Sequence, residues 1–448
     1  MKLNKNITGI KTRFFYDKVD KEYKDLVDGK YGTLKLIPNK ELLVCLGKKS
    51  ELNNEKLRKL GSSIYNSLKD AEKSVIIKTP LKDEENYFLM EGLLLSTYEF
   101  NKYKSEKKKA KLIEFYLDYK NAEKDFKKLS IIVKNVFIVR DLINEPPSVI
   151  NPKTFADIAK KLGKELKITV IGKKELEKKG AGGIIAVGQG ARHEPRLLKL
   201  EYTPLKKKEH IAIVGKGVTF DSGGYNLKPT GYIEDMKMDM GGAATTLSIM
   251  LAASELKVKK NLIAYIPLVE NMVSSTSYYP GDIIKMANGK TVEIANTDAE
   301  GRMILSDALF FAQKEKPELI LDFATLTGAV ITALGHNITA VVTNKDELYS
   351  DIFKVSKNTG EKVWQLPLYE EHEESVKGEL ADFKNLGWAK GAAGTITAAA
   401  LLKQFVNDTP WMHFDIAGTA YSYENKDYFK KGGTGTMVRT VLEWINSK

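Results

Sequence analysis

Cysteine is almost absent from this chain: Cys45 is the single one among 448 residues. One thiol can form neither an internal disulfide nor a cluster of thiolate metal ligands, so we expect Cys45 to be a buried apolar residue. No apolar run approaches the roughly 20 residues that a membrane-spanning helix needs, and residues 1–15 lack the continuous apolar segment of a secretory signal. We therefore expect a cytoplasmic protein in a reducing compartment, without a membrane partner.

Histidine and several familiar catalytic motifs are also scarce. The five histidines are scattered, and no His-Glu-x-x-His motif occurs, which argues against a histidine-based zinc site. They are His193, His210, His336, His372 and His413. The stretch "GKG…GG" lacks the spacing of a phosphate-binding loop, and Ser222 does not stand in a Gly-x-Ser-x-Gly turn. Nucleotide binding and serine hydrolysis are therefore weakly supported.

Positive charge is in excess and unevenly placed. The net charge is +12, and residues 1–145 carry 31 Lys and Arg against 22 Asp and Glu. A basic N-terminal half could attract nucleic acid, so an additional DNA-binding or regulatory role is the alternative function. A lysine-rich surface facing water, as predicted for 105–112, explains the charge more simply, and nucleic acid is not the favoured partner.

The length predicts two domains. Strands are expected at 41–47 and 74–80 and helices at 51–69 and 86–104, which indicates a small α/β domain. Pro146 and Pro147 stop the preceding helix, while Asn151 and Pro152 begin the next. We place the boundary there, which gives an N-terminal domain at 1–145 and a catalytic domain at 146–448. The role of the first domain is left open, with assembly as a candidate.

The second domain has a stronger pattern. Apolar strands without clean alternation are predicted at 210–217, 261–269, 319–326, 338–344 and 411–418, with helices at 241–256, 300–315 and 391–406. Strands of this kind are covered on both faces. We expect a three-layer α/β/α sandwich with a largely parallel central sheet. Functional sites of such sheets gather at the carboxyl ends of the strands, where the polar motifs of this sequence stand.

Two polar clusters occur there. In "NTDAEGR" (296–302), an extended chain would project Asp298, Glu300 and Arg302 to one side, although a salt-bridged helix start explains that segment equally well. The segment 215–246 offers several charged residues among seven glycines, notably Lys216, Asp221, Lys228, Asp235 and Asp239. Burying such charges costs several kcal/mol each unless they are paired or bind a metal.

The acidic members of both clusters suit a metal site. Asp221, Asp239, Asp298 and Glu300 offer oxygen ligands, and two cations roughly 3.5–4 Å apart can activate one water. Oxygen ligands favour Mn²⁺ or Mg²⁺, with Zn²⁺ also suitable. A lysine ligand must be neutral, so Lys216 would need a lowered pKa, which dications and desolvation would both favour. The spacing leaves open which lysine is a ligand.

The motifs "VGKGVTFDSGG", "MKMDMGGAA" and "NTDAEGR" closely resemble those of the leucyl (cytosol) aminopeptidase family. "NEPP", "PGD", "TLTGA", "ADFKN" and "HFDIAG" fit the same family, so the resemblance covers about 137–448. It implies a hydrolase that uses two divalent metals to remove N-terminal residues from peptides. Mn²⁺ or Zn²⁺ would be expected, with Mg²⁺ or Co²⁺ as substitutes, and family members form homohexamers.

The resemblance also implies roles for individual residues. Lys216, Asp221, Asp239, Asp298 and Glu300 match metal ligands, with Asp221 and Glu300 as the bridging pair. Lys228 and Arg302 match the catalytic residues, and the arginine would hold a bicarbonate ion that relays a proton. Met236, Thr325 and Gly328 align with positions lining the side-chain pocket. Asp235 matches no ligand and is interpreted as an outer or surface acid.

Overall fold

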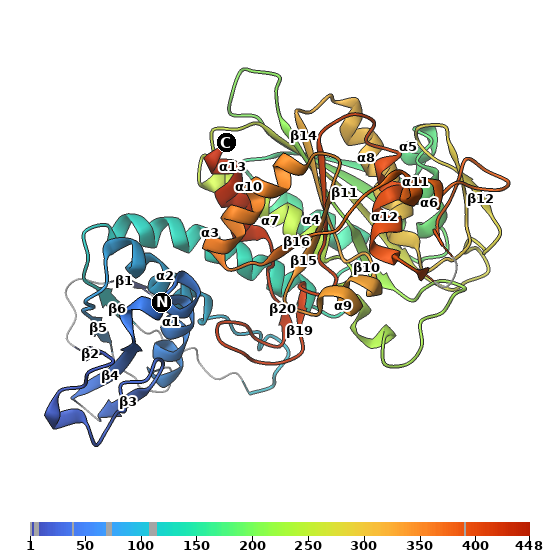
Figure 1. Cartoon of the computed structure of the whole chain (residues 1–448). Coiled ribbons are helices and arrows are strands. Elements are labelled where there is room, and N and C mark those ends of the chain that lie inside the picture. Colours follow the sequence, from blue (N-terminus) through green and yellow to red (C-terminus); the bar gives the residue numbers. More distant parts are fainter. Residues whose placement is uncertain (1, 4–8, 38–39, 69–73, 107–113, 389–390) are drawn as a thin grey trace. The chain divides into compact units, whose positions relative to one another are not determined.

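The computed structural model describes residues 2–3, 9–37, 40–68, 74–106, 114–388 and 391–448. The chain forms two compact units (Figure 1). Unit 1 comprises 1–134 with the short returning segments 358–360 and 423–431, and unit 2 comprises the rest. This division falls within helix α3 (Ala122–Asn144), whose end lies at the predicted boundary. The boundary near 145 stays a prediction, as does the solvated character of 105–112, most of which lies outside the described residues.

Unit 1 is built on a six-stranded sheet that is parallel except at one edge. Its order is β1 (Lys2–Leu3), β6 (Glu114–Leu117), β5 (Val75–Ile77), β2 (Ile10–Tyr16), β4 (Glu41–Gly47) and β3 (Leu34–Ile37), and only the β3–β4 pair is antiparallel. All residues of β4 are buried, including Cys45, which packs with Phe15 and Leu43. Burial raises the pKa of the Cys45 thiol. The prediction of an apolar, buried cysteine is confirmed.

Helices α1 (Asn54–Leu68) and α2 (Asp83–Leu95) of unit 1 pack closely through two glycines. A Cβ at Gly61 would lie 2.2 Å from Leu89 O, and a Cβ at Gly92 would lie 1.9 Å from Arg58 O. Neither position can hold a larger residue without moving a helix. Helix α2 ends at Leu95, so the predicted helix over 86–104 is too long at its polar end.

Unit 2 contains a nine-stranded sheet whose centre is parallel. Its order is β16 (Val363–Gln365), β15 (Thr339–Thr343), β18 (Trp411–Asp415), β14 (Leu319–Ala324), β9 (Ile211–Gly215), β11 (Leu262–Asn271), β8 (Arg196–Tyr202) and β7 (Lys167–Gly172), and β10 (Gly217–Asp221) also pairs with β11. The antiparallel pairs are β7–β8, β8–β11 and β15–β18. The four central strands, from β18 to β11, run parallel.

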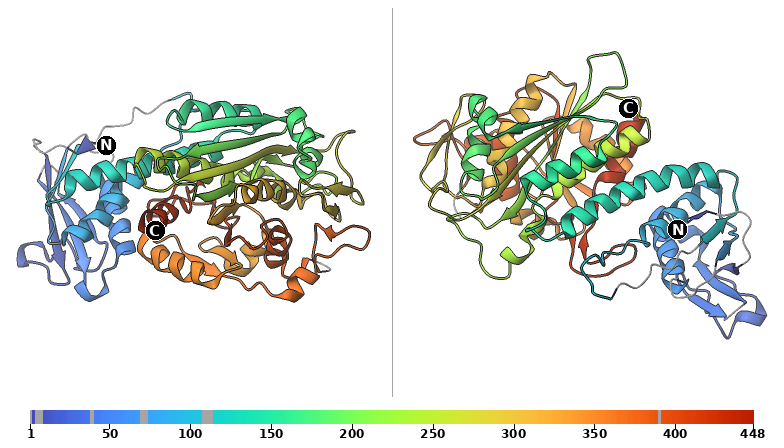
Figure 2. Two further views of the ribbon diagram at one scale, coloured as in Figure 1. Left: turned by 90° about the horizontal axis from the view of Figure 1, so that it is seen from above. Right: turned by 180° about the vertical axis from the view of Figure 1, so that it is seen from behind.

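Helices cover both faces of this sheet (Figure 2). A Cβ at Gly215 would contact Gly242 and Thr246 of α7 (Gly241–Glu255), so this face of β9 meets α7. The alternate residues Ala212 and Val214 belong to the core that contains α8 (Glu300–Lys314). The fold predicted from the apolar strands is therefore confirmed: a small α/β domain and a sandwich with a mostly parallel sheet.

Further helices of unit 2 complete the layers. They are α4 (Pro152–Leu162), α5 (Lys173–Lys178), α6 (Gly182–Gly188), α9 (Gly328–Leu334), α10 (Asp346–Thr359), α11 (Glu370–Glu374), α12 (Gly394–Lys403) and α13 (Val438–Ser447). The Asn151 side chain accepts hydrogen bonds from the N–H groups of Lys153 and Thr154, which caps α4 as its sequence predicts. Helix α12 begins later than predicted because Ala393 has a φ of 51°. Across the described ranges, no helix is both long and apolar enough to cross a membrane.

Candidate metal centre

The site begins where the sequence predicted one continuous strand over 210–217. The structure instead divides this segment into β9 and β10 at Lys216, whose N–H donates to Phe323 O at 3.0 Å. Strand β9 lies between β14 and β11, whereas β10 pairs farther along β11. The lysine thus stands at the carboxyl end of β9, among the strand ends where the parallel sheet places functional groups.

Two glycines make room for Lys216. A Cβ at Gly242 would lie 2.9 Å from Lys216 N and 2.0 Å from Phe323 O. A Cβ at Gly301, in the first turn of α8, would lie 2.5 Å from Lys216 Cε. The glycines in "MGGAA" and "AEGR" therefore have a steric reason: they let the start of α7 approach the backbone of Lys216 and the start of α8 approach its side chain.

The Lys216 ammonium is buried among oxygen atoms. It donates to Asp239 Oδ1 at 2.7 Å and Thr325 O at 2.9 Å, and it lies 2.9 Å from Glu300 Oε1. Desolvation lowers the pKa of Lys216, but the carboxylates of Asp239 and Glu300 outweigh it and hold the pKa above its ordinary value. The expected lowering of this pKa therefore does not arise from the protein's own charges and depends on bound dications.

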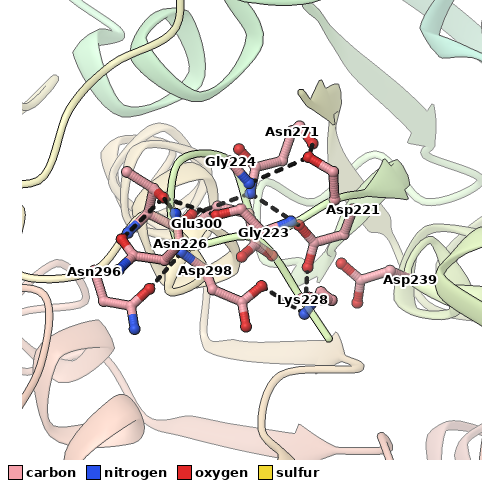
Figure 3. Close-up of polar contacts among 12 residues, drawn as sticks. Asp221, Gly223, Gly224, Asn226, Lys228, Asp239, Asn271, Asn296, Asp298 and Glu300 are labelled. Atoms are coloured by element: carbon pink, nitrogen blue, oxygen red, sulfur yellow. Dashed lines mark hydrogen bonds and ion pairs between the residues drawn. The ribbon is translucent and has the colours of Figure 1, made fainter. Parts of the chain in front are cut away.

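Three carboxylates meet on the other side of the cluster. Ligand oxygens of Asp221, Asp298 and Glu300 all lie within 4.8 Å of one another. Lys228 Nζ stands between the first two, 2.8 Å from Asp221 Oδ2 and 2.6 Å from Asp298 Oδ1 (Figure 3). Burial opposes the charge on Lys228, but the surrounding acids raise its pKa above the ordinary value. This lysine is an ammonium in the cluster.

The charges of the cluster do not balance. Four carboxylates (Asp221, Asp239, Asp298 and Glu300) face two ammonium groups. Burial is the main cause that raises the pKa of Asp298 to about 7, and repulsion from Asp221 and Glu300 adds to it. Asp239 Oδ2 and Glu300 Oε2 are buried with no hydrogen-bond partner among the residues that the structure describes. Each such acceptor costs about 1–3 kcal/mol, so a purely structural salt-bridge cluster is a poor explanation. Cations coordinated by these oxygens fit the donor set.

Hydrogen bonds join the two loops that carry these acids. Thr297 Oγ1 donates to Gly223 O at 2.7 Å and accepts the Asn226 N–H at 2.9 Å. Asn226 Oδ1 accepts the Thr297 N–H at 2.8 Å, and Asn296 Oδ1 accepts the Asp298 N–H at 2.7 Å (Figure 3). The structure therefore brings together the two clusters of 215–246 and 296–302, which are separate in the sequence.

Arg302 lies buried in the first turn of α8. Its Nη1 donates to Asn385 O at 2.8 Å, and its Nε has no partner among the described residues. Desolvation lowers the pKa of Arg302 to about 10, although the negative charge of Glu300 acts to raise it. The Asn385 side chain also binds the backbone of Asn296 and accepts from Ala295 N. Sequence reasoning gave Asn385 no role, because a neutral amide 83 residues from Arg302 provides no charge or spacing signal.

The three predicted pocket residues lie on different elements. Thr325, after β14, donates from its hydroxyl to Asp239 Oδ1 at 2.7 Å and so contacts the cluster directly. Met236 lies on the 3₁₀ helix η3 (Ile233–Met238), and Gly328 begins α9. Asp235 is partly buried on η3 and has no place among the acids that converge. A shared pocket of Met236, Thr325 and Gly328 stays a prediction.

Comparison with known proteins decides the family. The model of the cytosol aminopeptidase family, catalytic domain, matches residues 137–442, and the N-terminal domain model matches 27–107. The chain belongs to the cytosol aminopeptidase family. The probable cytosol aminopeptidase of Clostridium perfringens is 39% identical over 426 residues, covering 91% of this chain and 86% of the relative. That of Cenarchaeum symbiosum is 41% identical over 429 residues, covering 93% and 88%.

Solved structures of similar proteins agree with this membership. The cytosol aminopeptidase of Coxiella burnetii has a TM-score of 0.89 at 31% identity, covering 99% of this chain and 98% of its own. The bottromycin maturation enzyme BotP in complex with Mn has a TM-score of 0.90 at 30% identity, covering 98% and 99%. As a cytosol aminopeptidase family member, the chain is an aminopeptidase and a hydrolase, and the acidic cluster supports a metal-dependent one.

Proposed function

We propose that this chain is a leucyl aminopeptidase that uses two divalent cations, Mn²⁺ or Zn²⁺, to remove N-terminal residues from peptides. The observation that carries this proposal is the convergence of Asp221, Asp298 and Glu300 within 4.8 Å beside two lysines. Asp221, Asp239, Asp298, Glu300 and Lys216 would hold the cations. Bound there, divalent cations would acidify water and polarise the scissile carbonyl. Lys216 would have to lose its proton to serve as a ligand.

Two further cationic side chains have catalytic roles in this proposal. The Lys228 ammonium, partly buried between Asp221 and Asp298, would stabilise the negative charge that develops on the carbonyl oxygen. The Nε of Arg302 has no hydrogen-bond partner among the described residues. This supports a role for Arg302 in holding a bicarbonate ion that relays a proton. Selectivity for peptide ends would follow from recognition of the free α-amine at the same cluster.

The proposed specificity is broad and apolar, with leucine-type residues preferred. Met236, Thr325 and Gly328 would line the pocket for the first side chain of the peptide. Differences of a methylene in such a pocket change the rate by only about 10–200-fold, so several apolar residues would be accepted.

A paired-substrate assay tests the function. With Mn²⁺ present we expect hydrolysis of leucine p-nitroanilide, loss of the activity on adding a chelator, and recovery on adding Mn²⁺ back. N-acetyl-leucine p-nitroanilide should resist cleavage, because the acetyl group removes the free amine. Equal cleavage of both compounds would refute recognition of the amine, and activity that survives chelation would refute the metal site.

The assembly and the cellular role are further parts of the proposal. We propose a homohexamer in the cytoplasm that serves peptide catabolism, supported by the resemblance of the motifs and measurable by analytical ultracentrifugation. The alternative, additional binding of DNA, is supported only by the excess of positive charge in residues 1–145. Absence of a gel shift with duplex DNA at low salt would remove it.

A further inference from the structure

Asn271, the last residue of β11, lies directly behind the acidic cluster and carries no charge of its own. It is fully buried, and strand pairing places it opposite Asp221 at the end of β10. Its Nδ2 donates to Asp221 Oδ1 at 2.8 Å and to Thr297 O at 3.0 Å. One amide group therefore joins the loop that carries Asp221 to the loop that carries Asp298 (Figure 3).

These contacts fix which oxygen of Asp221 faces the cluster. Asp221 Oδ1 accepts from Asn271 Nδ2 and from the Gly223 N–H at 2.9 Å. Asp221 Oδ2 lies 2.8 Å from Lys228 Nζ, on the side of the other carboxylates. With Oδ1 occupied by two donors, the carboxylate is held with Oδ2 directed toward the site.

The chemistry of the partners also fixes the orientation of the amide. Both Asp221 Oδ1 and Thr297 O are acceptors, so only the NH₂ group of Asn271 can face them. Its Oδ1 then points away, toward Gly224, where a Cβ would lie 3.0 Å from it. Backbone contacts secure the residue further, since Asn271 O accepts from Ser222 N at 2.9 Å and Ser222 Oγ at 2.7 Å.

We infer that Asn271 is a positioning residue of the metal centre: its amide sets the orientation of the Asp221 carboxylate and its distance from the loop of Asp298. The inference rests on the proposed function and adds a residue to it. Partners that orient a metal ligand typically change metal affinity by about 10–100-fold when they are removed. Asn271 touches neither the cluster's lysines nor its other acids in the contacts described, so its effect passes through Asp221 and Thr297.

The same strand supplies a matched control at its opposite end. Asn261, immediately before β11, is also buried, and its Nδ2 donates to two backbone carbonyls, Lys207 O at 2.8 Å and Glu209 O at 3.3 Å. Replacing either asparagine by leucine keeps a similar size, adds no charge and removes the side-chain hydrogen bonds: two for Asn271, and three for Asn261, whose Oδ1 also accepts the Leu205 N–H at 3.0 Å. A purely structural role would make the two variants behave alike.

Manganese titration of the full chain tests the inference. Mn²⁺ affinity is measured by calorimetry for the wild type, Asn271→Leu and Asn261→Leu, with circular dichroism to verify folding. We expect about a 10–100-fold loss of affinity for Asn271→Leu and a change within about twofold for Asn261→Leu. The KM for leucine p-nitroanilide at saturating Mn²⁺ should stay within about twofold in both. If Asn271→Leu does not fold, Asn271→Ala takes its place.

The outcomes separate the inference from the proposed function. If the wild type binds Mn²⁺ and cleaves the substrate but both variants keep its affinity, Asn271 has no positioning role and the proposed function stands. If both variants lose affinity equally, the effect is general destabilisation and the inference is overturned. A wild type that neither binds Mn²⁺ nor cleaves the substrate removes the proposed function and this inference together.

Discussion

Units 1 and 2 both bury charged side chains, but they satisfy them differently. In unit 1, each nitrogen of the Arg58 guanidinium finds an acceptor: Nε donates to Glu91, Nη1 to Glu55 at 3.3 Å and Nη2 to Asn358 O at 2.6 Å. In unit 2, four carboxylates share two ammonium groups, and buried oxygens of Asp239 and Glu300 lack donors among the described residues. Completed hydrogen bonding is what a structural ion pair requires, whereas an excess of buried acceptors indicates a ligand.

The largest effect that would test this comparison is on stability in unit 1. Arg58→Ala removes the cation facing the buried Glu91 carboxylate and should lower the free energy of unfolding by about 3–5 kcal/mol. Urea unfolding followed by circular dichroism measures the change. The rate of leucine p-nitroanilide hydrolysis per folded chain should not change, because the cluster residues all lie in unit 2.

An exposed ion pair of unit 1 provides the control. Lys48 lies 3.6 Å from Glu51 with both side chains more than half exposed, so Lys48→Ala should cost no more than about 1 kcal/mol. Equal losses for Arg58→Ala and Lys48→Ala would show that burial does not distinguish the two pairs.

The next effect is catalytic and lies in unit 2. Lys228→Ala removes the ammonium between Asp221 and Asp298, and kcat should fall about 100–1,000-fold, as for loss of a group that stabilises a developing negative charge. With Mn²⁺ present, the unfolding midpoint should change little, because the cations would take over the pairing of the two acids. Steady-state kinetics with leucine p-nitroanilide and thermal unfolding measure the two quantities.

Lys237 is the matched control for that substitution. It lies on η3 in the same segment, and its Nζ donates to Asn144 O at 2.8 Å rather than to the cluster. Lys237→Ala should leave kcat within about twofold. A full rate for Lys228→Ala would remove this lysine from the mechanism, and an equal loss in both variants would show a general effect of the segment.

The same contrast explains how much of the molecule the sequence predicted. Strands β9, β11, β14, β15 and β18 were predicted because runs of apolar residues mark strands buried on both faces. The break at Lys216 was missed, because "HIAIVGKG" (210–217) was predicted as one strand. The break depends on pairing with β14 and β11, which are distant in sequence. The edge strand β7 and its neighbour β8 were missed as well, because partly exposed strands have a weaker apolar pattern.

The candidate site was predictable to the extent that its residues are charged. A high density of acids and lysines at strand ends pointed to Asp221, Asp298 and Glu300, and the structure brings these three together. No role was predicted for Asn271 or Asn385, because a neutral amide carries no charge that must be paired when it is buried, and amides occur widely in loops. Their positions follow from strand pairing and loop contacts, which only the folded structure supplies.

The smallest effect tests the steric reason for one glycine of the site. Gly301→Ala would place a Cβ 2.5 Å from Lys216 Cε and 2.8 Å from Lys216 Nζ. Although alanine is the better helix former, this contact should make the variant about 1–3 kcal/mol less stable and should weaken Mn²⁺ binding by displacing Lys216. Gly172→Ala is the control, since its Cβ meets nothing within 4 Å, and should change stability by at most about 0.5 kcal/mol. Calorimetric titration and urea unfolding of both variants make the comparison. Unchanged Mn²⁺ affinity and stability in Gly301→Ala would mean that Lys216 can move aside freely, and a rigid arrangement of the cluster would then be wrong.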